Sequence, residues 1–116
     1  MREATMDRRI RKTKQQLRQS LTTLLKQKRV QDITVRELAE LADINRGTFY
    51  LHYRDVFDLL NQIEEELLGE LESVLEKYQP GSILPNTVQI FKDVYELVQK
   101  NSEIVGILMG DHGEWN

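Results

Sequence analysis

Residues 34–55 read TVRELAELADINRGTFYLHYRD and contain two helix starts separated by a tight turn. Thr34 is followed three residues later by Glu37, which is the spacing of a capping box, where each side chain bonds the other residue's backbone N–H. The apolar residues of this segment then repeat at helical spacing and define one buried face: Val35, Leu38, Ala39 and Ala42. The pattern predicts a helix over residues 35–42.

The connection 43–45 is too short for a free loop, and its last residue, Asn45, is a good N-cap for a second helix over 46–52. That helix is unusual because its first turns carry hydrogen-bonding side chains, namely Arg46, Thr48, Tyr50 and His52. Gly47 has no side chain and allows another molecule to approach closely. A helix-turn-helix whose second helix presents polar, basic and aromatic groups is suited to the major groove of DNA.

Residues 42–53, ADINRGTFYLHY, resemble the signature of the TetR family of bacterial transcriptional regulators. That signature runs Ala-Gly-Val-Ser, a basic or small residue, Gly, Thr, an apolar residue, Tyr, any residue, His or Tyr, then Phe. The resemblance is close over residues 34–60 and extends over 10–78 in helix lengths and spacing. Two positions depart from it: Asp43 stands where the family usually has glycine, and Val56 where it often has a phosphate-contacting lysine.

The resemblance implies an all-α protein with a three-helix DNA-binding domain over residues 1–54. A long connecting helix and the first helices of a helical regulatory domain would follow over 55–116. It also implies that Phe49 and Tyr53 pack in the core, and that Tyr50 and His52 bind phosphates. Arginine can bind guanine bidentately, and threonine can reach a base edge, so Arg46 and Thr48 are the candidate base-reading residues.

The predicted DNA-binding residues are Thr34, Asn45, Arg46, Gly47, Thr48, Tyr50, His52 and Arg54. Two of them have a second interpretation. Thr34 can act as an N-cap, as a phosphate ligand at a helix start, or as both. His52 can bind phosphate or cap helix carbonyls, and it has no second histidine or acidic cluster at the spacing of a metal site.

Charge divides the chain into two parts of opposite sign. Residues 1–54 hold 13 Lys and Arg against 6 Asp and Glu, a net +7, whereas residues 55–116 hold 3 against 13, a net −10. Only the first part should therefore face a polyanion such as DNA. Its N-terminal helix carries cations that either touch phosphates or are simply solvated: Arg9, Arg11, Lys12, Lys14, Arg18, Lys26 and Lys28.

Composition excludes several classes of protein. The chain has no cysteine, so it has neither disulfides nor thiolate metal sites, which fits a reducing cytoplasm. No apolar run approaches the roughly 18 residues of a membrane span, and the N-terminus lacks the apolar region of a signal peptide. No nucleophile with a base, phosphate loop or metal spacing indicates an enzyme, and no cofactor is implied. The glutamates at 64–66, 70, 72 and 76 are expected to form a solvated helix face.

The remaining boundaries follow from periodicity and from helix breakers. We expect residues 1–7 to be frayed, a first helix from Arg8 to Gln31-Asp32, and a long helix over 56–78 beginning at the cap Asp55. Gln79-Pro80-Gly81-Ser82 is the predicted linker. A helix from Thr87 then places Val88, Phe91, Val94, Tyr95 and Val98 on one face. A short apolar segment over 104–109 and a turn at 110–113 follow.

Regulators of this family continue through further helices that close a ligand cavity and form the dimer interface. We therefore expect this chain to be a fragment, because the 104–109 segment and Trp115 have few partners within it. The candidate effector-binding residues are Phe91, Tyr95, Val98 and Met109, although for each of them a place in the core is the favoured interpretation.

The resulting hypothesis is a sequence-specific regulator, most often a repressor, that binds a pseudo-palindromic operator in double-stranded DNA as a homodimer. A small-molecule effector would shift the protein between DNA-binding and non-binding states. The alternative is a helical protein-binding module, or an activator that binds DNA and is controlled by a partner protein.

Overall fold

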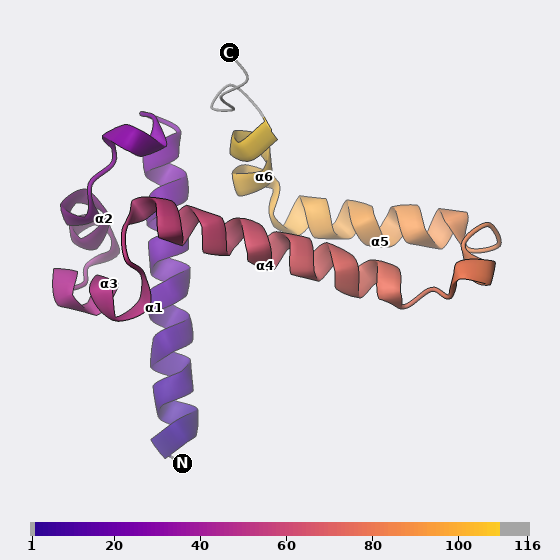
Figure 1. The fold of residues 1–116 in the computed structure, drawn as a ribbon, viewed down its shortest axis with the longest axis horizontal. Coiled ribbons are helices and arrows are strands. Elements are labelled where there is room, and N and C mark those ends of the chain that lie inside the picture. Colours follow the sequence, from indigo (N-terminus) through magenta and orange to yellow (C-terminus); the bar gives the residue numbers. More distant parts are fainter. Residues whose placement is uncertain (1, 110–116) are drawn as a thin grey trace. The chain divides into compact units, whose positions relative to one another are not determined.

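The computed structural model describes the backbone of residues 2–109 and the side chains of residues 7–109. Within this part, every regular element is helical, which confirms the all-α prediction. The elements are α1 (Arg2–Leu25), η1 (Val30–Asp32), α2 (Val35–Ala42), α3 (Arg46–His52), α4 (Val56–Glu76), η2 (Pro80–Ser82), α5 (Thr87–Lys100) and α6 (Ser102–Met109) (Figure 1). None of the described helices is long and apolar enough to cross a membrane.

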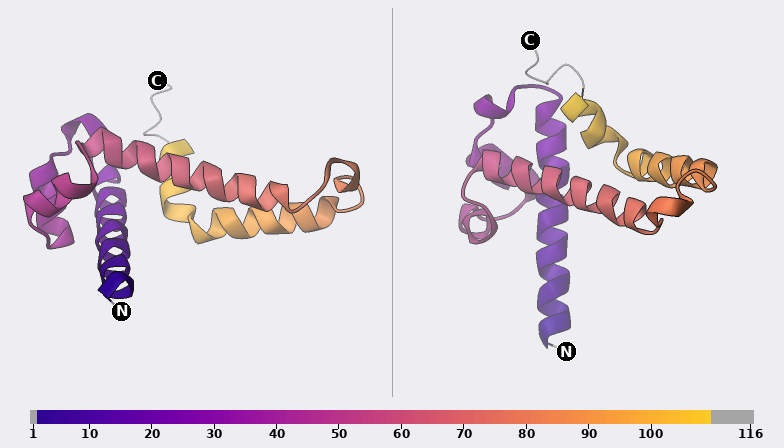
Figure 2. Two further views of the ribbon diagram at one scale, coloured as in Figure 1. Left: turned by 60° about the horizontal axis from the view of Figure 1, so that its bottom comes forward. Right: turned by 45° about the vertical axis from the view of Figure 1, so that its right-hand side comes forward.

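The chain divides into two compact units, Met1–Asn61 and Gln62–Asn116, here called unit 1 and unit 2. Their boundary falls inside α4, so this one helix contributes residues to both units. In unit 1, α2 and α3 lie on the same side of α1 (Figure 1, Figure 2). α2 packs against both α1 and α3.

The core of unit 1 is built from the apolar faces of these helices. Its largest fully buried side chains are Phe49, Leu17, Leu21, Leu38 and Leu59. Leu24, Leu25 and Tyr53 are buried as well, so the core positions of Phe49 and Tyr53 are confirmed.

Both predicted ends of the first helix are wrong. α1 begins at Arg2 instead of Arg8, and it ends at Leu25 instead of Gln31-Asp32. No proline or glycine marks the end. The N–H groups of Gln27 and Lys28 both bond the carbonyl of Leu24, which closes the last turn. The chain then passes through η1 and returns the apolar side chain of Ile33 to the core.

The turn between α2 and α3 depends on one left-handed residue. Asp43 has φ 59° and ψ 47°, and it is the only non-glycine residue with positive φ among those described. The N–H of Ile44 bonds the carbonyl of Ala39 at 2.9 Å, and that of Asp43 bonds Glu40 at 3.2 Å. This pair of bonds is the Schellman motif, in which glycine is usual because it lacks a Cβ. Aspartate is among the few side chains that tolerate the conformation.

Unit 2 contains the rest of α4, followed by α5 and α6. Tyr78 donates a short hydrogen bond to Asp93, which ties the end of the α4 segment to α5. This bond raises the pKa of the Tyr78 hydroxyl and, together with a bond from Gln89, lowers the pKa of the Asp93 carboxyl. Lys100 and Glu70 form an ion pair at 3.5 Å between the same two helices.

Several predictions for unit 2 need correction. α4 ends at Glu76, two residues before the predicted end. The predicted apolar face of α5 is not buried as a whole: Val88, Phe91 and Tyr95 are exposed, while Val94 is half-buried. The half-buried side of α5 also includes Ile90 and Leu97. The predicted turn at 110–113 and Trp115 lie outside the described residues.

The left-handed conformation of Asp43 leads to a stability prediction. Asp43→Gly should raise the free energy of unfolding by about 0.5–1 kcal/mol, because glycine removes the steric cost of positive φ. Urea denaturation followed by circular dichroism measures the change. Glu40→Gly is the matched control, since the same glycine placed inside α2 should lower stability by about 1 kcal/mol. A loss of stability in Asp43→Gly would contradict the explanation.

Candidate nucleic-acid interface

α3 has one buried side and one outward side. Phe49 and Tyr53 are buried, with their ring centroids 5.6 Å apart. On the outward side, Arg46, Tyr50 and Leu51 are exposed. The Tyr50 ring stands edge-on to the Phe49 ring, with centroids 5.4 Å apart and an interplanar angle of 88°. The buried aromatic residues therefore fix which side chains of this short helix reach solvent.

The start of α3 explains the pairing of Asn45 with Gly47. The Asn45 side-chain oxygen accepts a hydrogen bond from the Gly47 N–H at 2.8 Å, as the N-cap prediction requires. A Cβ added to Gly47 would lie 3.3 Å from that same oxygen. Glycine thus has an intramolecular reason to be there, because a methyl group would crowd the cap. Its predicted role, close approach by DNA, is compatible with this one.

The capping box at the start of α2 is also confirmed. The Thr34 hydroxyl accepts from the Glu37 N–H at 3.0 Å, and a Glu37 carboxylate oxygen accepts from the Thr34 N–H at 3.1 Å. Lys28 donates to the other carboxylate oxygen in an ion pair. The Lys28 ammonium and the Thr34 N–H together hold the pKa of Glu37 below its ordinary value. Thr34 is exposed, so its predicted phosphate contact is sterically open.

The other predicted DNA-binding residues lie beside the outward side of α3. Thr48 and His52 are half-buried on the flank of α3, and the His52 ring lies 6.2 Å from the Tyr53 ring. Arg54 is exposed just after the helix. Its N–H bonds Asp58 at 2.9 Å, while the Asp58 N–H bonds Asp55 at 2.8 Å. These two bonds fix the turn into α4, and they confirm Asp55 as its cap.

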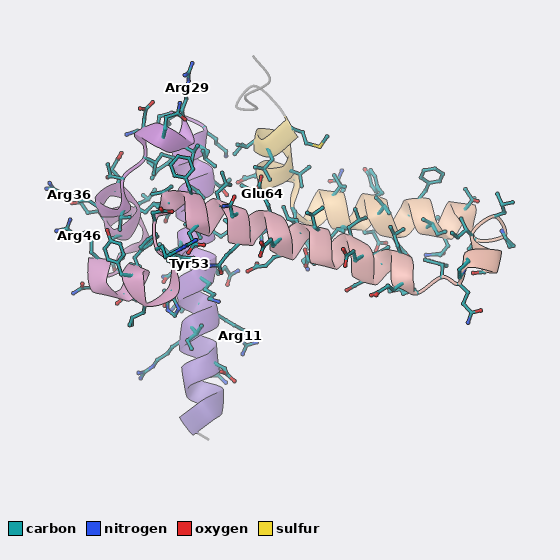
Figure 3. All side chains as sticks on the ribbon, viewed as in Figure 1. Arg11, Arg29, Arg36, Arg46, Tyr53 and Glu64 are labelled. Atoms are coloured by element: carbon teal, nitrogen blue, oxygen red, sulfur yellow. The ribbon has the colours of Figure 1, made fainter. Side chains whose placement is uncertain are left out.

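Two exposed residues were missed by sequence reasoning. Leu51 is 79% exposed, although it is an apolar residue in the middle of a helix-turn-helix. The sequence could have indicated this exposure, because Leu51 follows Gly47 by one helical turn and so lies on the same side of α3. Arg36 on α2 projects to the same side of unit 1 as Arg46 (Figure 3). It forms an exposed ion pair with Glu40 at 3.3 Å, a pairing that contributes little to stability and leaves the guanidinium accessible.

The structure places the candidate effector-binding residues in two different environments. Val98 and Met109 line an apolar groove of about 520 Å³ in unit 2. Phe91 and Tyr95 do not line it, and they are exposed at 71% and 63%. Within the described residues, no group of three or more histidine, aspartate or glutamate side chains is arranged to hold a metal ion.

One curated protein resembles this chain. It is an uncharacterised HTH-type transcriptional regulator of Bacillus subtilis, YxbF, with 38% identity over 60 residues. The matched region makes up 52% of this chain but only 16% of YxbF, so the chain spans a small part of that protein. No protein-family model matches the chain, and no solved structure matches it. The chain is therefore similar, over about half its length, to a helix-turn-helix transcriptional regulator.

Because of the capping box, the free energy of unfolding of unit 1 should decrease at acidic pH. The pKa of Glu37 is lower in the folded chain than its ordinary value of 4.5, so its stabilising effect is complete above that value. The effect is lost as the pH falls through the lower, folded pKa. Glu37→Gln should therefore flatten the decline in stability below about pH 4.5.

Lys28→Met tests the cause of the shift, because Lys28 makes the largest contribution to it. This variant should move the Glu37 pKa back toward 4.5, as followed by NMR of the side-chain carboxyl. An unchanged pKa would show that the ion pair does not hold the carboxylate.

Proposed function

We propose that this chain is the DNA-binding part of a transcriptional regulator, and that α3 of unit 1 enters the major groove of double-stranded DNA. The observation that carries the proposal is the outward side of α3, where Arg46, Tyr50 and Leu51 are exposed opposite the buried Phe49 and Tyr53. A core does not require an arginine and a tyrosine at these exposed positions. The similarity to a helix-turn-helix regulator supports the same function.

The exposed residues suggest a division of labour. Arg46 would read guanine through its two parallel N–H donors, and Leu51 would contact a thymine methyl group. Tyr50, His52, Arg54 and the cap residue Thr34 would bind phosphates and set the position of α3 along the groove. Thr48, on the flank, would reach a base edge or a phosphate.

The charges of unit 1 supply affinity that does not depend on sequence. Among Met1–Asn61, 13 Lys and Arg stand against 8 Asp and Glu, a net +5. Each phosphate that these cations neutralise releases counterions, so binding should weaken steeply with salt. Arg36, which projects to the same side as Arg46, extends the positive surface from α3 onto α2 (Figure 3).

The finer proposal is a TetR-like repressor that binds a pseudo-palindromic operator as a homodimer and releases it when an effector occupies unit 2. The resemblance of residues 42–53 to the TetR signature supports it. So does α4, which runs from Val56 to Glu76 without a break and is shared by both units. A helix shared in this way offers a continuous path along which a ligand could act on the DNA-binding unit.

A second candidate is a DNA-binding activator controlled by a partner protein. The observation that favours it is the exposed apolar side of α5, where Val88, Phe91 and Tyr95 are 69%, 71% and 63% exposed. Exposed apolar patches of this kind often mark protein-binding surfaces. The two candidates share the DNA contact and differ in what occupies unit 2.

Selection of random duplex DNA by the purified protein tests the shared function. Enrichment of a sequence would support a regulator, and enrichment of a two-fold palindrome would support the homodimer. Absence of any enrichment, from protein shown to be folded, would contradict sequence-specific binding.

The selected site then permits a test of the division of labour. Arg46→Ala should cost roughly 1–3 kcal/mol on that site and relax base choice at one position, because a bidentate base contact is lost. Tyr50→Phe should weaken selected and random DNA about equally, because a phosphate contact carries no sequence information. Fluorescence anisotropy at fixed salt measures both.

Arg29→Ala is the matched control for charge. Arg29 is exposed and projects away from Arg36 and Arg46 (Figure 3), and its loss changes the net charge as Arg46→Ala does. It should leave base preference unchanged. If Arg46→Ala and Tyr50→Phe both lose equal affinity on selected and random DNA, the assignment of Arg46 as the reader is wrong.

A further inference from the structure

The groove of unit 2 is lined almost entirely by apolar side chains. It has a volume of about 520 Å³, within the range of about 300–1,000 Å³ that is usual for small-molecule sites. The lining residues are Glu64, Leu67, Leu68, Leu71, Val94, Leu97, Val98, Val105, Leu108 and Met109. All of them belong to unit 2 and come from α4, α5 and α6. Such a lining suits an apolar ligand.

Glu64 is the exception in this lining. Its side chain is half-buried on α4, on the side toward α6, and Leu67 and Leu68 follow it by one helical turn (Figure 3). Among the described residues, it makes neither a hydrogen bond nor an ion pair. Next to apolar surface, a carboxylate attracts a cation more strongly than it does in bulk water, because water screens the charge less.

The cations of unit 2 do not neutralise this carboxylate. Lys100, on α5, pairs with Glu70 at 3.5 Å instead. Across Gln62–Asn116, 3 Lys stand against 11 Asp and Glu, a net −8, so the potential around the groove also favours a positive ligand. Both local and overall charge therefore select the same sign.

We propose that this groove binds a lipophilic cation of drug-like size, with its apolar groups against the leucine and valine side chains and its positive charge beside Glu64. The proposal deepens the proposed function, since the cation would be the effector of the regulator. A neutral lipophile would leave the carboxylate without a partner, and a lipophilic anion would be repelled by it. Charge complementarity thus separates this ligand class from others of the same size.

Two ions of nearly identical shape and opposite charge provide the test. Tetraphenylphosphonium and tetraphenylborate are titrated separately into the purified protein, and binding is measured by isothermal titration calorimetry. The cation should bind at least about tenfold more tightly than the anion. A tenfold difference in affinity corresponds to about 1.4 kcal/mol, which a single partly screened charge pair can supply. Equal affinities, a preference for the anion, or no binding of either ion would overturn the proposal.

Two variants locate the source of the preference. Glu64→Gln keeps the size of the side chain and removes its charge, so it should abolish the preference for the cation. Glu65→Gln makes the same change in net charge at the neighbouring exposed residue, and it should retain the preference. If Glu64→Gln still prefers the cation, or if both variants lose the preference equally, the groove carboxylate is not the determinant. Circular dichroism of each variant checks that it is folded.

A separate measurement distinguishes failure of this inference from failure of the proposed function. The calorimetric result needs no DNA, so it judges the groove even if unit 1 binds no operator. Fluorescence anisotropy with the selected operator, with and without tetraphenylphosphonium, then judges the regulatory link. Cation binding without any change in DNA affinity would keep the groove assignment and reject the cation's role as an effector.

Discussion

Burial of Phe49 is the interaction on which the candidate interface depends. α3 has only seven residues, far too few for a helix to be stable by itself in water. It persists because Phe49 is fully buried with leucines of α1, α2 and α4, and because Tyr53 follows it into the same core. The same burial sets the rotation of the helix. Arg46 and Tyr50 point outward as a consequence of where the aromatic side chains go.

Local capping supplies the second layer of order. Thr34, Asn45 and Asp55 stand at three successive helix starts, and each side chain accepts a backbone N–H from the turn that it opens. In each bond the donor and the acceptor lie within a few residues of one another in the sequence, so no distant partner is required. They fix where the helices begin, while the shared core fixes how they pack. The exposed side of α3 needs both, because Arg46 is its first residue and a start one residue later would leave Arg46 outside the helix.

What the sequence predicted well was local, and what it missed depended on tertiary packing. The capping box, the Asn45 cap and the bounds of α2 and α3 follow from residue types at fixed short spacing. The end of α1 at Leu25 was missed because no breaker marks it; the chain turns there to bury Ile33. The sequence did not indicate which side of α5 is buried, because apolar residues lie on more than one side and only packing selects among them. The groove of unit 2 was invisible for the same reason, since its lining comes from three helices.

The opposite charges of the two units have a consequence for how the protein behaves in solution. The acidic unit of one molecule attracts the basic unit of another, so at low ionic strength the protein should compete electrostatically for the surface that we propose binds DNA. This head-to-tail attraction fades as the Debye length falls to about 10 Å at 0.1 M salt. Added salt should therefore act on two equilibria at once, because it weakens the proposed contacts to phosphate and also frees the surface that would make them. The salt dependence of the proposed DNA binding should consequently be shallower in concentrated protein than in dilute protein.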